Sequence, residues 1–126
     1  MKGIEFEQEI YHKLKTYITD DKILVSTRIF TGKSPWGVEI DILFLDQIIG
    51  KVKRFHKDEL WAIEIKNHEE KIDIEHIKKF YDDISGITKN LYFISKNGFT
   101  YEAYRLMRDL NMRNGTGSYL PFSDLF

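Results

Sequence analysis

A short apolar run, Leu91-Tyr-Phe-Ile94, constrains the fold of this chain more than any other feature of the sequence. The run is continuous rather than alternating and contains two aromatic residues, which is typical of a strand buried on both faces of a sheet. Such a strand requires a helical layer on each side. The sequence therefore predicts an α/β fold in which helices flank a central mixed sheet.

Periodic patterns place the other elements around that run. Apolar residues that recur every three or four positions predict an amphipathic helix from Phe6 to about Thr19. Alternation predicts a strand from Lys22 to Phe30, and Asp73 and Thr100 are suitable N-caps for two later helices. The predicted order is helix, three strands, helix, strand, helix, with the second and third strands at about 38–46 and 59–66.

Length and composition limit the hypotheses. The 126 residues fit one domain, which we place at residues 1–113, followed by a glycine-containing linker and an aromatic tail at 114–126. The chain has 42% hydrophobic and 31% charged residues, so extensive disorder is excluded. It contains no cysteine, which excludes a disulfide framework, a thiolate zinc site and a cysteine nucleophile.

The expected location follows from the same features. The absence of cysteine fits a reducing compartment, and the start MKGIEFEQEI carries acidic residues where a signal peptide needs an apolar run. No stretch approaches the ~20 apolar residues of a membrane span. We therefore expect a cytoplasmic protein that does not enter a membrane. The formal net charge of -1 means that composition alone does not indicate a nucleic-acid binder.

Four ionisable residues interrupt the second and third predicted strands, which are otherwise nearly apolar. Alternation assigns Glu39 and Asp41 to one face of the second strand, and Glu64 and Lys66 to one face of the third. If the strands pair as a hairpin with those faces aligned, three carboxylates and one ammonium converge. A divalent cation bound by carboxylate oxygens is the usual compensation for such a cluster. The opposite face of the second strand is predicted to be apolar, with Val38, Ile40, Ile42 and Phe44.

The first predicted helix adds another carboxylate. At about 100° per residue, Glu7 falls within the apolar arc of the helix, whereas Glu5 and Glu9 project away from it. A simpler interpretation remains open, in which Glu64 and Lys66 form an ordinary ion pair and Glu7 only borders the apolar stripe. The coincidence of four charges in register with Glu7 favours a metal site.

These residues and their order resemble the PD-(D/E)XK nuclease superfamily, whose core has the order helix, three strands, helix, strand. The motif is Asp41 in EIDILF followed by Glu64-Ile65-Lys66 in WAIEIKN. The start Gly3-Ile-Glu-Phe-Glu7 resembles the G-x-x-F-E start of many members, and ISKNGFTYEAYRLM resembles the strand, turn and helix of Mrr-type nucleases. The chain has no proline before Asp41, a departure from the motif that many members share. The similarity extends from about Gly3 to Leu110 and implies a restriction-endonuclease-like core.

The resemblance also implies an activity, the metal-dependent hydrolysis of phosphodiester bonds. Asp41 and Glu64 would hold Mg²⁺, which Mn²⁺ can replace, with the main-chain carbonyl of Ile65 as a further ligand. Lys66 would orient the attacking water and help to deprotonate it. Glu7 would complete the outer shell of the metal or hold a second ion.

The connection between the two charged strands carries a local group of cations. In a nuclease these side chains would grip phosphates on either side of the cut, but a solvated hairpin tip would have the same composition. Arg105 and Arg108 are a second candidate for phosphate binding, although Glu102 and Asp109 lie within helical reach of Arg105. His68 is the histidine nearest in sequence to the predicted site. The group of cations comprises Lys51, Lys53, Arg54, His56 and Lys57.

The leading hypothesis is a metal-dependent endonuclease with DNA as its substrate. One small domain contacts a single cleavage site, so we expect a homodimer or a subunit of a larger assembly. Two alternatives stay open: a module of the same fold that binds nucleic acid or protein without cleavage, and an RNA-directed nuclease. The intact set of Asp41, Glu64 and Lys66 favours an enzyme over the module, and Glu39 is an optional ligand.

Overall fold

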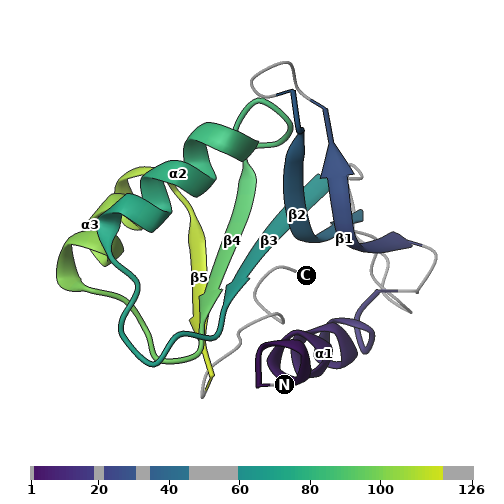
Figure 1. Ribbon diagram of the computed structural model, residues 1–126, viewed down its shortest axis with the longest axis horizontal. Coiled ribbons are helices and arrows are strands. Elements are labelled where there is room, and N and C mark those ends of the chain that lie inside the picture. Colours follow the sequence, from purple (N-terminus) through teal and green to yellow (C-terminus); the bar gives the residue numbers. More distant parts are fainter. Residues whose placement is uncertain (1, 19–21, 31–34, 46–59, 118–126) are drawn as a thin grey trace, which may run out of the picture.

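The computed structural model describes residues 2–18, 22–30, 35–45 and 60–117 of the chain. Within these ranges the predicted order of helix, three strands, helix, strand and helix is confirmed, and one further strand follows it (Figure 1). No helix in the same ranges is long and apolar enough to cross a bilayer. The elements are α1 Lys2–Leu14, β1 Ile23–Ile29, β2 Val38–Leu45, β3 Leu60–Lys66, α2 Ile74–Ile84, β4 Asn90–Ser95, α3 Tyr101–Asp109 and β5 Arg113–Thr116.

The strands form one mixed sheet in the order β1-β2-β3-β4-β5. Neighbouring strands are antiparallel from β1 to β3 and parallel from β3 to β5. Each parallel pair needs a crossover connection, and α2 and α3 provide the two crossovers. The first part of the sheet is therefore an antiparallel meander, and the second part consists of two β-α-β units.

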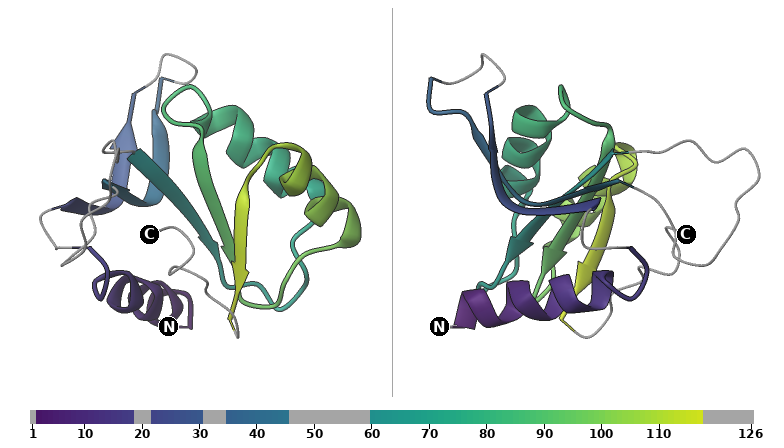
Figure 2. Two further views of the ribbon diagram at one scale, coloured as in Figure 1. Left: turned by 180° about the vertical axis from the view of Figure 1, so that it is seen from behind. Right: turned by 90° about the vertical axis from the view of Figure 1, so that its right-hand side faces the viewer.

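Helices cover both faces of the parallel part (Figures 1 and 2). Leu91 and Phe93 of β4 pack in a cluster with α2 and α3, whereas Tyr92 and Ile94 pack in a cluster with α1. None of these four side chains is more than 2% exposed. The prediction of a strand buried on both faces is confirmed.

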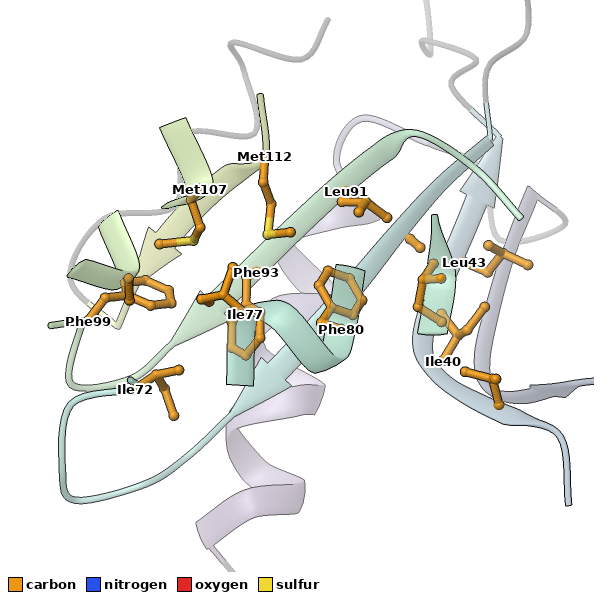
Figure 3. Packing of buried hydrophobic residues seen from close by; sticks show 14 residues of the cluster. Ile40, Leu43, Ile72, Ile77, Phe80, Leu91, Phe93, Phe99, Met107 and Met112 are labelled. Carbon is orange, nitrogen blue, oxygen red and sulfur yellow. The ribbon is translucent and has the colours of Figure 1, made fainter. Parts of the chain in front are cut away.

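Aromatic contacts fill the space between the sheet and α2 and α3. The ring of Phe93 meets the ring of Phe80 edge to face, with centroids 5.5 Å apart, and the ring of Phe99 in the same way at 5.6 Å (Figure 3). Ile77 and Met107 complete this layer and are fully buried. Phe93 is thus the residue through which β4 contacts several elements at once.

Side chains cap α2 and α3 as predicted. The Oδ1 atom of Asp73 accepts hydrogen bonds from the amides of Glu75 at 3.1 Å and His76 at 3.3 Å. The Oγ1 atom of Thr100 accepts one from the amide of Ala103 at 3.3 Å. Both caps satisfy amides that have no partner within their own helix.

A backbone bridge holds the starts of α2 and α3 together. The amide of Ile72 donates to the carbonyl of Gly98 at 3.0 Å, and the amide of Thr100 donates to the carbonyl of Ile72 at 2.9 Å. Ile72 and Phe99 therefore form an isolated parallel bridge just before the two helices.

The end of α1 differs from the prediction. The helix ends at Leu14 rather than near Thr19. Ile18 still reaches the core that α1 covers, from a turn in which its amide donates to the carbonyl of Leu14 at 3.1 Å. The spacing of apolar residues thus continues through a turn that is no longer regular helix.

Residues 113–116 form β5, although we predicted a linker from Asn114 onward. Tyr92 is the partner of Arg113, and Ser95 is the partner of Thr116. The prediction of a linker is therefore wrong for 114–116. An edge strand gains its stability from pairing with its neighbour more than from its own composition, which the turn-like sequence conceals. The aromatic tail from residue 118 lies outside the described residues.

Side chains of β2 change sides of the sheet at Asp41. Ile40 belongs to the cluster under α2 and α3, whereas Ile42 belongs to the cluster under α1. The prediction that the even-numbered residues of 38–44 share one face is therefore wrong. In β1, Ser26 lies between the residues that pair with Ile40 and Ile42 and has a positive φ of 48°. Both strands bend sharply in this region (Figure 2, right).

Candidate active site

The pairing of β2 with β3 ends where the ionisable residues of β2 begin. The last pair of this ladder is Ile42 with Ile63. At the residue just before Ile42 in the chain, the Oδ2 atom of Asp41 accepts a hydrogen bond from the backbone amide of Ile65 at 2.8 Å. A side-chain carboxylate thus takes the place of a strand carbonyl at this edge of β3.

The backbone carbonyl of Ile65 points to the same side as its amide. In a strand, the amide and carbonyl of one residue face the same neighbour, and those of the next residue face the opposite one. The carbonyl of Lys66 accordingly accepts from the amide of Lys96 on the β4 side, at 3.0 Å. The Ile65 carbonyl therefore faces the side of Asp41, where the resemblance requires a metal ligand.

Glu64 is the most strongly perturbed acid among the residues that the structure describes. Its side chain is 20% exposed, and its Oε1 atom lies 3.9 Å from the Nζ atom of Lys66. Burial raises the pKa of Glu64 to about 9, with further contributions from its hydrogen bond to Asp41 and from the charge of Asp41; Lys66 opposes the shift. At neutral pH the metal-free carboxyl of Glu64 therefore retains its proton.

Glu7 joins this group from α1. Its side chain is partly buried, whereas Glu5 and Glu9 are exposed, as the helical periodicity predicts. Burial raises the pKa of Glu7, and the negative charge of Asp41 raises it further, while Lys66 lowers it. The charge of Glu7 is therefore felt at the same place as those of Asp41 and Lys66.

Glu39 lies at the border of the group. Its carboxylate is exposed and lies 3.5 Å from the guanidinium of Arg28 on β1. Its negative charge contributes to the raised pKa values of both Glu7 and Glu64. Glu39 is thus near the acidic group but has an arginine partner of its own.

Two cavities meet at Asp41. One, of about 380 Å³, is lined by Gly37 just before β2, by Glu39 of β2, by Glu64 and Lys66 of β3, and by residues of α2. The other, of about 440 Å³, lies between α1 and the β1–β2 pair. Asp41 is the residue that lines both of these cavities.

Helix α2 brings further residues to the site that the sequence did not single out. Lys79 and Asp83 line the cavity of Glu64 and Lys66, and the Nζ atom of Lys79 lies 2.9 Å from Asp83 Oδ2. His76 and Phe80 line a smaller adjoining cavity of about 70 Å³. The only sequence signal was an ordinary i,i+4 charge pair on a helix surface, which does not reveal what the helix faces.

The carboxylates of Asp41 and Glu64 fit a hard divalent cation that retains water ligands. Because the side chains of Glu64 and Asp41 are hydrogen-bonded to each other, both lie within reach of one cation. Across residues 2–18, 22–30, 35–45 and 60–117, no three His, Asp or Glu side chains are grouped closely enough to form a complete metal site. Mg²⁺ commonly binds through one or two carboxylates together with waters and substrate oxygens, and the pair matches that mode.

Other candidate residues lie elsewhere. Arg105 contributes to a separate hollow on α3, and Arg108 lies 3.9 Å from Asp109. His68 is exposed, with its ring centroid 5.7 Å from that of His76. The cationic residues Lys51, Lys53, Arg54, His56 and Lys57 fall outside the described residues.

Comparisons with known proteins bear on the fold alone. No family model and no curated protein matches the sequence. The chain is similar to the crystal structure of a protein of unknown function, AF1548, with a TM-score of 0.59 and 15% identity over 92% of this chain. It spans 60% of the length of that protein. The mixed α/β fold is therefore shared with a solved structure, and any statement on function depends on the site itself.

Proposed function

We propose that this chain is a metal-dependent nuclease domain of the PD-(D/E)XK type, with a restriction-endonuclease-like core, that hydrolyses phosphodiester bonds in DNA. The observation that carries the proposal is the meeting of Asp41 with Glu64 at the point where β2 leaves β3, with Lys66 beside Glu64. The order of α1, three antiparallel strands, α2 and β4 also supports it, because the superfamily core has that order.

Each residue of the site has a separate role in the proposed reaction. Asp41 and Glu64 would hold Mg²⁺, and the carbonyl of Ile65 faces the same side. When bound, the ion would supply a water ligand of lowered pKa and positive charge that offsets the negative charge developing on the phosphate. Lys66 places an ammonium next to this water, where it orients the nucleophile and stabilises hydroxide.

Two residues around this centre have supporting roles in the proposal. Glu7, whose charge is coupled to that of Asp41, holds outer-shell water of the ion or a second ion. Lys79 faces the cavity from α2 and is paired with Asp83. An incoming phosphate oxygen can replace Asp83 as its partner.

Cleavage assays with different substrates test the proposal. Plasmid, single-stranded, branched and RNA substrates are incubated with Mg²⁺ or Mn²⁺, with EDTA as the control. Asp41→Asn and Glu64→Gln keep the shape of each side chain and should abolish cleavage, while Glu70→Gln, in an exposed turn, should not change it. Calorimetry should detect Mg²⁺ binding to the parent protein and not to Asp41→Asn.

Two results would lead to the other functions. If the parent protein binds DNA tightly but cuts no substrate with any divalent ion, the chain is a binding module of the same fold. If it cuts RNA alone, the same chemistry serves an RNA-directed nuclease.

A further inference from the structure

Beyond the bend at Asp41, β1 and β2 continue as an arm, which we define as residues 27–30 and 35–40. The arm rises beside α2 and away from the rest of the sheet (Figure 2, right). Two large aromatic side chains lie near its end, where Phe30 is 70% exposed and Trp36 is 77% exposed. Exposed rings of this size need an explanation, because burial of an aromatic side chain is among the largest single contributions to packing.

Contacts within the arm hold the backbone that carries these two rings. Arg28 donates from Nη1 to the carbonyl of Trp36 at 2.7 Å, and its Nη2 atom lies 3.5 Å from Glu39. Gly37 has a φ of 77°, and a Cβ atom at this position would lie 3.1 Å from the ring of Phe30. The glycine therefore serves both a left-handed backbone and a close approach to Phe30. The backbone at Trp36 and Gly37 is thus held by contacts with Arg28 and Phe30.

The arm is continuous with the candidate active site. Gly37, next to Trp36, lines the same cavity as Asp41 and Glu64. Lys79 of α2 lines the cavity as well. A polynucleotide strand with one phosphate at Asp41 and Glu64 would therefore pass its neighbouring nucleotides between the arm and α2.

The surroundings favour a nucleobase over a protein side chain as the occupant. The rings stand on an arm whose Arg28 and Glu39 are exposed and charged. Lys66 and Lys79 supply ammonium groups that can meet phosphates on the same strand. Every nucleobase has a flat π face, so stacking on aromatic side chains is independent of sequence.

We infer that Trp36 and Phe30 form a stacking platform for unpaired nucleobases beside the scissile phosphate. This inference rests on the proposed function and specifies its substrate class: single-stranded DNA, or DNA with an unpaired flap or branch, in preference to a fully paired duplex. A base within a duplex presents no free face to such rings, so pairing and stacking compete.

Binding measurements without catalysis test the platform. The anisotropy of a labelled oligo(dT) and of a blunt duplex of the same length is measured in EDTA. Trp36→Ala should weaken single-strand binding roughly 5- to 150-fold, with little change for the duplex. Trp36→Phe retains a ring and should preserve most of the affinity. Tyr101→Ala is the matched control, because Tyr101 is 74% exposed on α3 and outside both cavities.

Tryptophan fluorescence provides an independent readout. Trp36 is one of two tryptophans, and the other, Trp61, is 8% exposed. Addition of oligo(dT) should quench the emission of the parent protein and leave that of Trp36→Phe, which comes from Trp61, almost unchanged.

The outcomes separate this inference from the proposed function. Equal single-strand binding by the parent protein, Trp36→Ala and Phe30→Ala overturns the platform, even if the parent protein cleaves DNA. An equal loss of single-strand and duplex binding also overturns it. So does a dimer in sedimentation that Trp36→Ala dissociates, because the rings would then form a subunit interface. Single-strand binding through Trp36 without any cleavage supports the platform and rejects the nuclease. Circular dichroism and a Trp36→Leu variant distinguish loss of the ring from loss of the fold.

Discussion

The two parts of the sheet present opposite environments to their side chains. In the parallel part, β4 is buried on both faces, and Leu91, Tyr92, Phe93, Ile94 and Ser95 are all buried. In the meander, Leu24 and Val25 of β1 are 55% and 53% exposed. The ionisable residues lie at the boundary between these parts, where β2 bends and leaves β3.

This arrangement shows how a folded chain can carry several acids next to its core. The parallel part supplies the apolar burial, and within it β3 places Glu64 and Lys66 opposite Phe93 and Ser95 of β4. The bend at Asp41 then allows one carboxylate to accept a backbone amide without opening the helix-covered layers. Each part can therefore be perturbed separately.

The largest effect is expected on the cleavage rate, from a substitution of Lys66 at the boundary between the two parts of the sheet. Lys66→Ala should reduce cleavage by roughly 10²- to 10⁴-fold, because the ammonium acts on the attacking water in the transition state. DNA affinity should change little. Single-turnover cleavage and anisotropy measure the two quantities, and Lys71→Ala, an exposed lysine after β3, is the control. Loss of DNA binding in Lys66→Ala would favour the binding-module interpretation.

The next largest effect is expected on stability, where substitutions in the parallel part and in the meander should differ. Phe93→Ala should lower the free energy of unfolding by about 3–5 kcal/mol, because it leaves a cavity between Phe80 and Phe99. Leu24→Ala, at an exposed position of β1, should change it by about 0.5 kcal/mol or less. Urea denaturation measures both. Similar losses in the two variants would show that the meander is as strongly packed as the parallel part.

The stability of the metal-free protein should depend on pH through the carboxyl of Glu64. Because the pKa of Glu64 is about 9 in the folded protein, against 4.5 in the absence of burial, the folded state binds more protons than the unfolded state between these values. Through this group the metal-free protein should become less stable as pH rises from 5 to 9, by at most about 1.4 kcal/mol per pH unit. Glu64→Gln should flatten this slope in urea denaturation, with Glu70→Gln as the control. An unchanged slope would mean that Glu64 is ionised in the folded protein.

The smallest effect is expected on the salt dependence of DNA binding, from a substitution of Lys79 in the cavity of Glu64 and Lys66. Lys79→Ala should reduce the slope of log affinity against log salt by about 1, which corresponds to one lost phosphate contact. Lys78→Ala is a close control, because Lys78 is on the same helix and is paired with Glu75 at 3.6 Å. If both variants alter the slope equally, the effect comes from general charge and not from a contact in the cavity.

The sequence predicted β4 and the caps of α2 and α3, but it missed β5 of the same parallel part. The continuous run at 91–94 and the caps Asp73 and Thr100 act locally or through simple burial, so their patterns survive folding. β5 was missed because Asn114 and Gly115 read as a turn, and its partner β4 is distant along the chain. Pairing between remote segments leaves no local signal in a strand of four residues.

For the site, the sequence identified the acids but not their arrangement. Asp41, Glu64 and Lys66 were visible because they interrupt apolar strands, and the structure brings them together with Glu7. The bend that breaks the alternation of β2 could not be predicted, since Ser26 gives no indication of a positive φ. Lys79 and Asp83 were missed because their role depends on which side of the sheet α2 crosses.

The bridge between Ile72 and Phe99 has a consequence for the way this protein opens. Because the amides of Ile72 and Thr100 bond across the starts of α2 and α3, neither helix can detach at that end without releasing the other. Local fluctuations should therefore open the two helices as one cooperative unit. In native-state hydrogen exchange, both amides should exchange with the same opening free energy, while amides of the exposed strand β1 exchange independently and sooner.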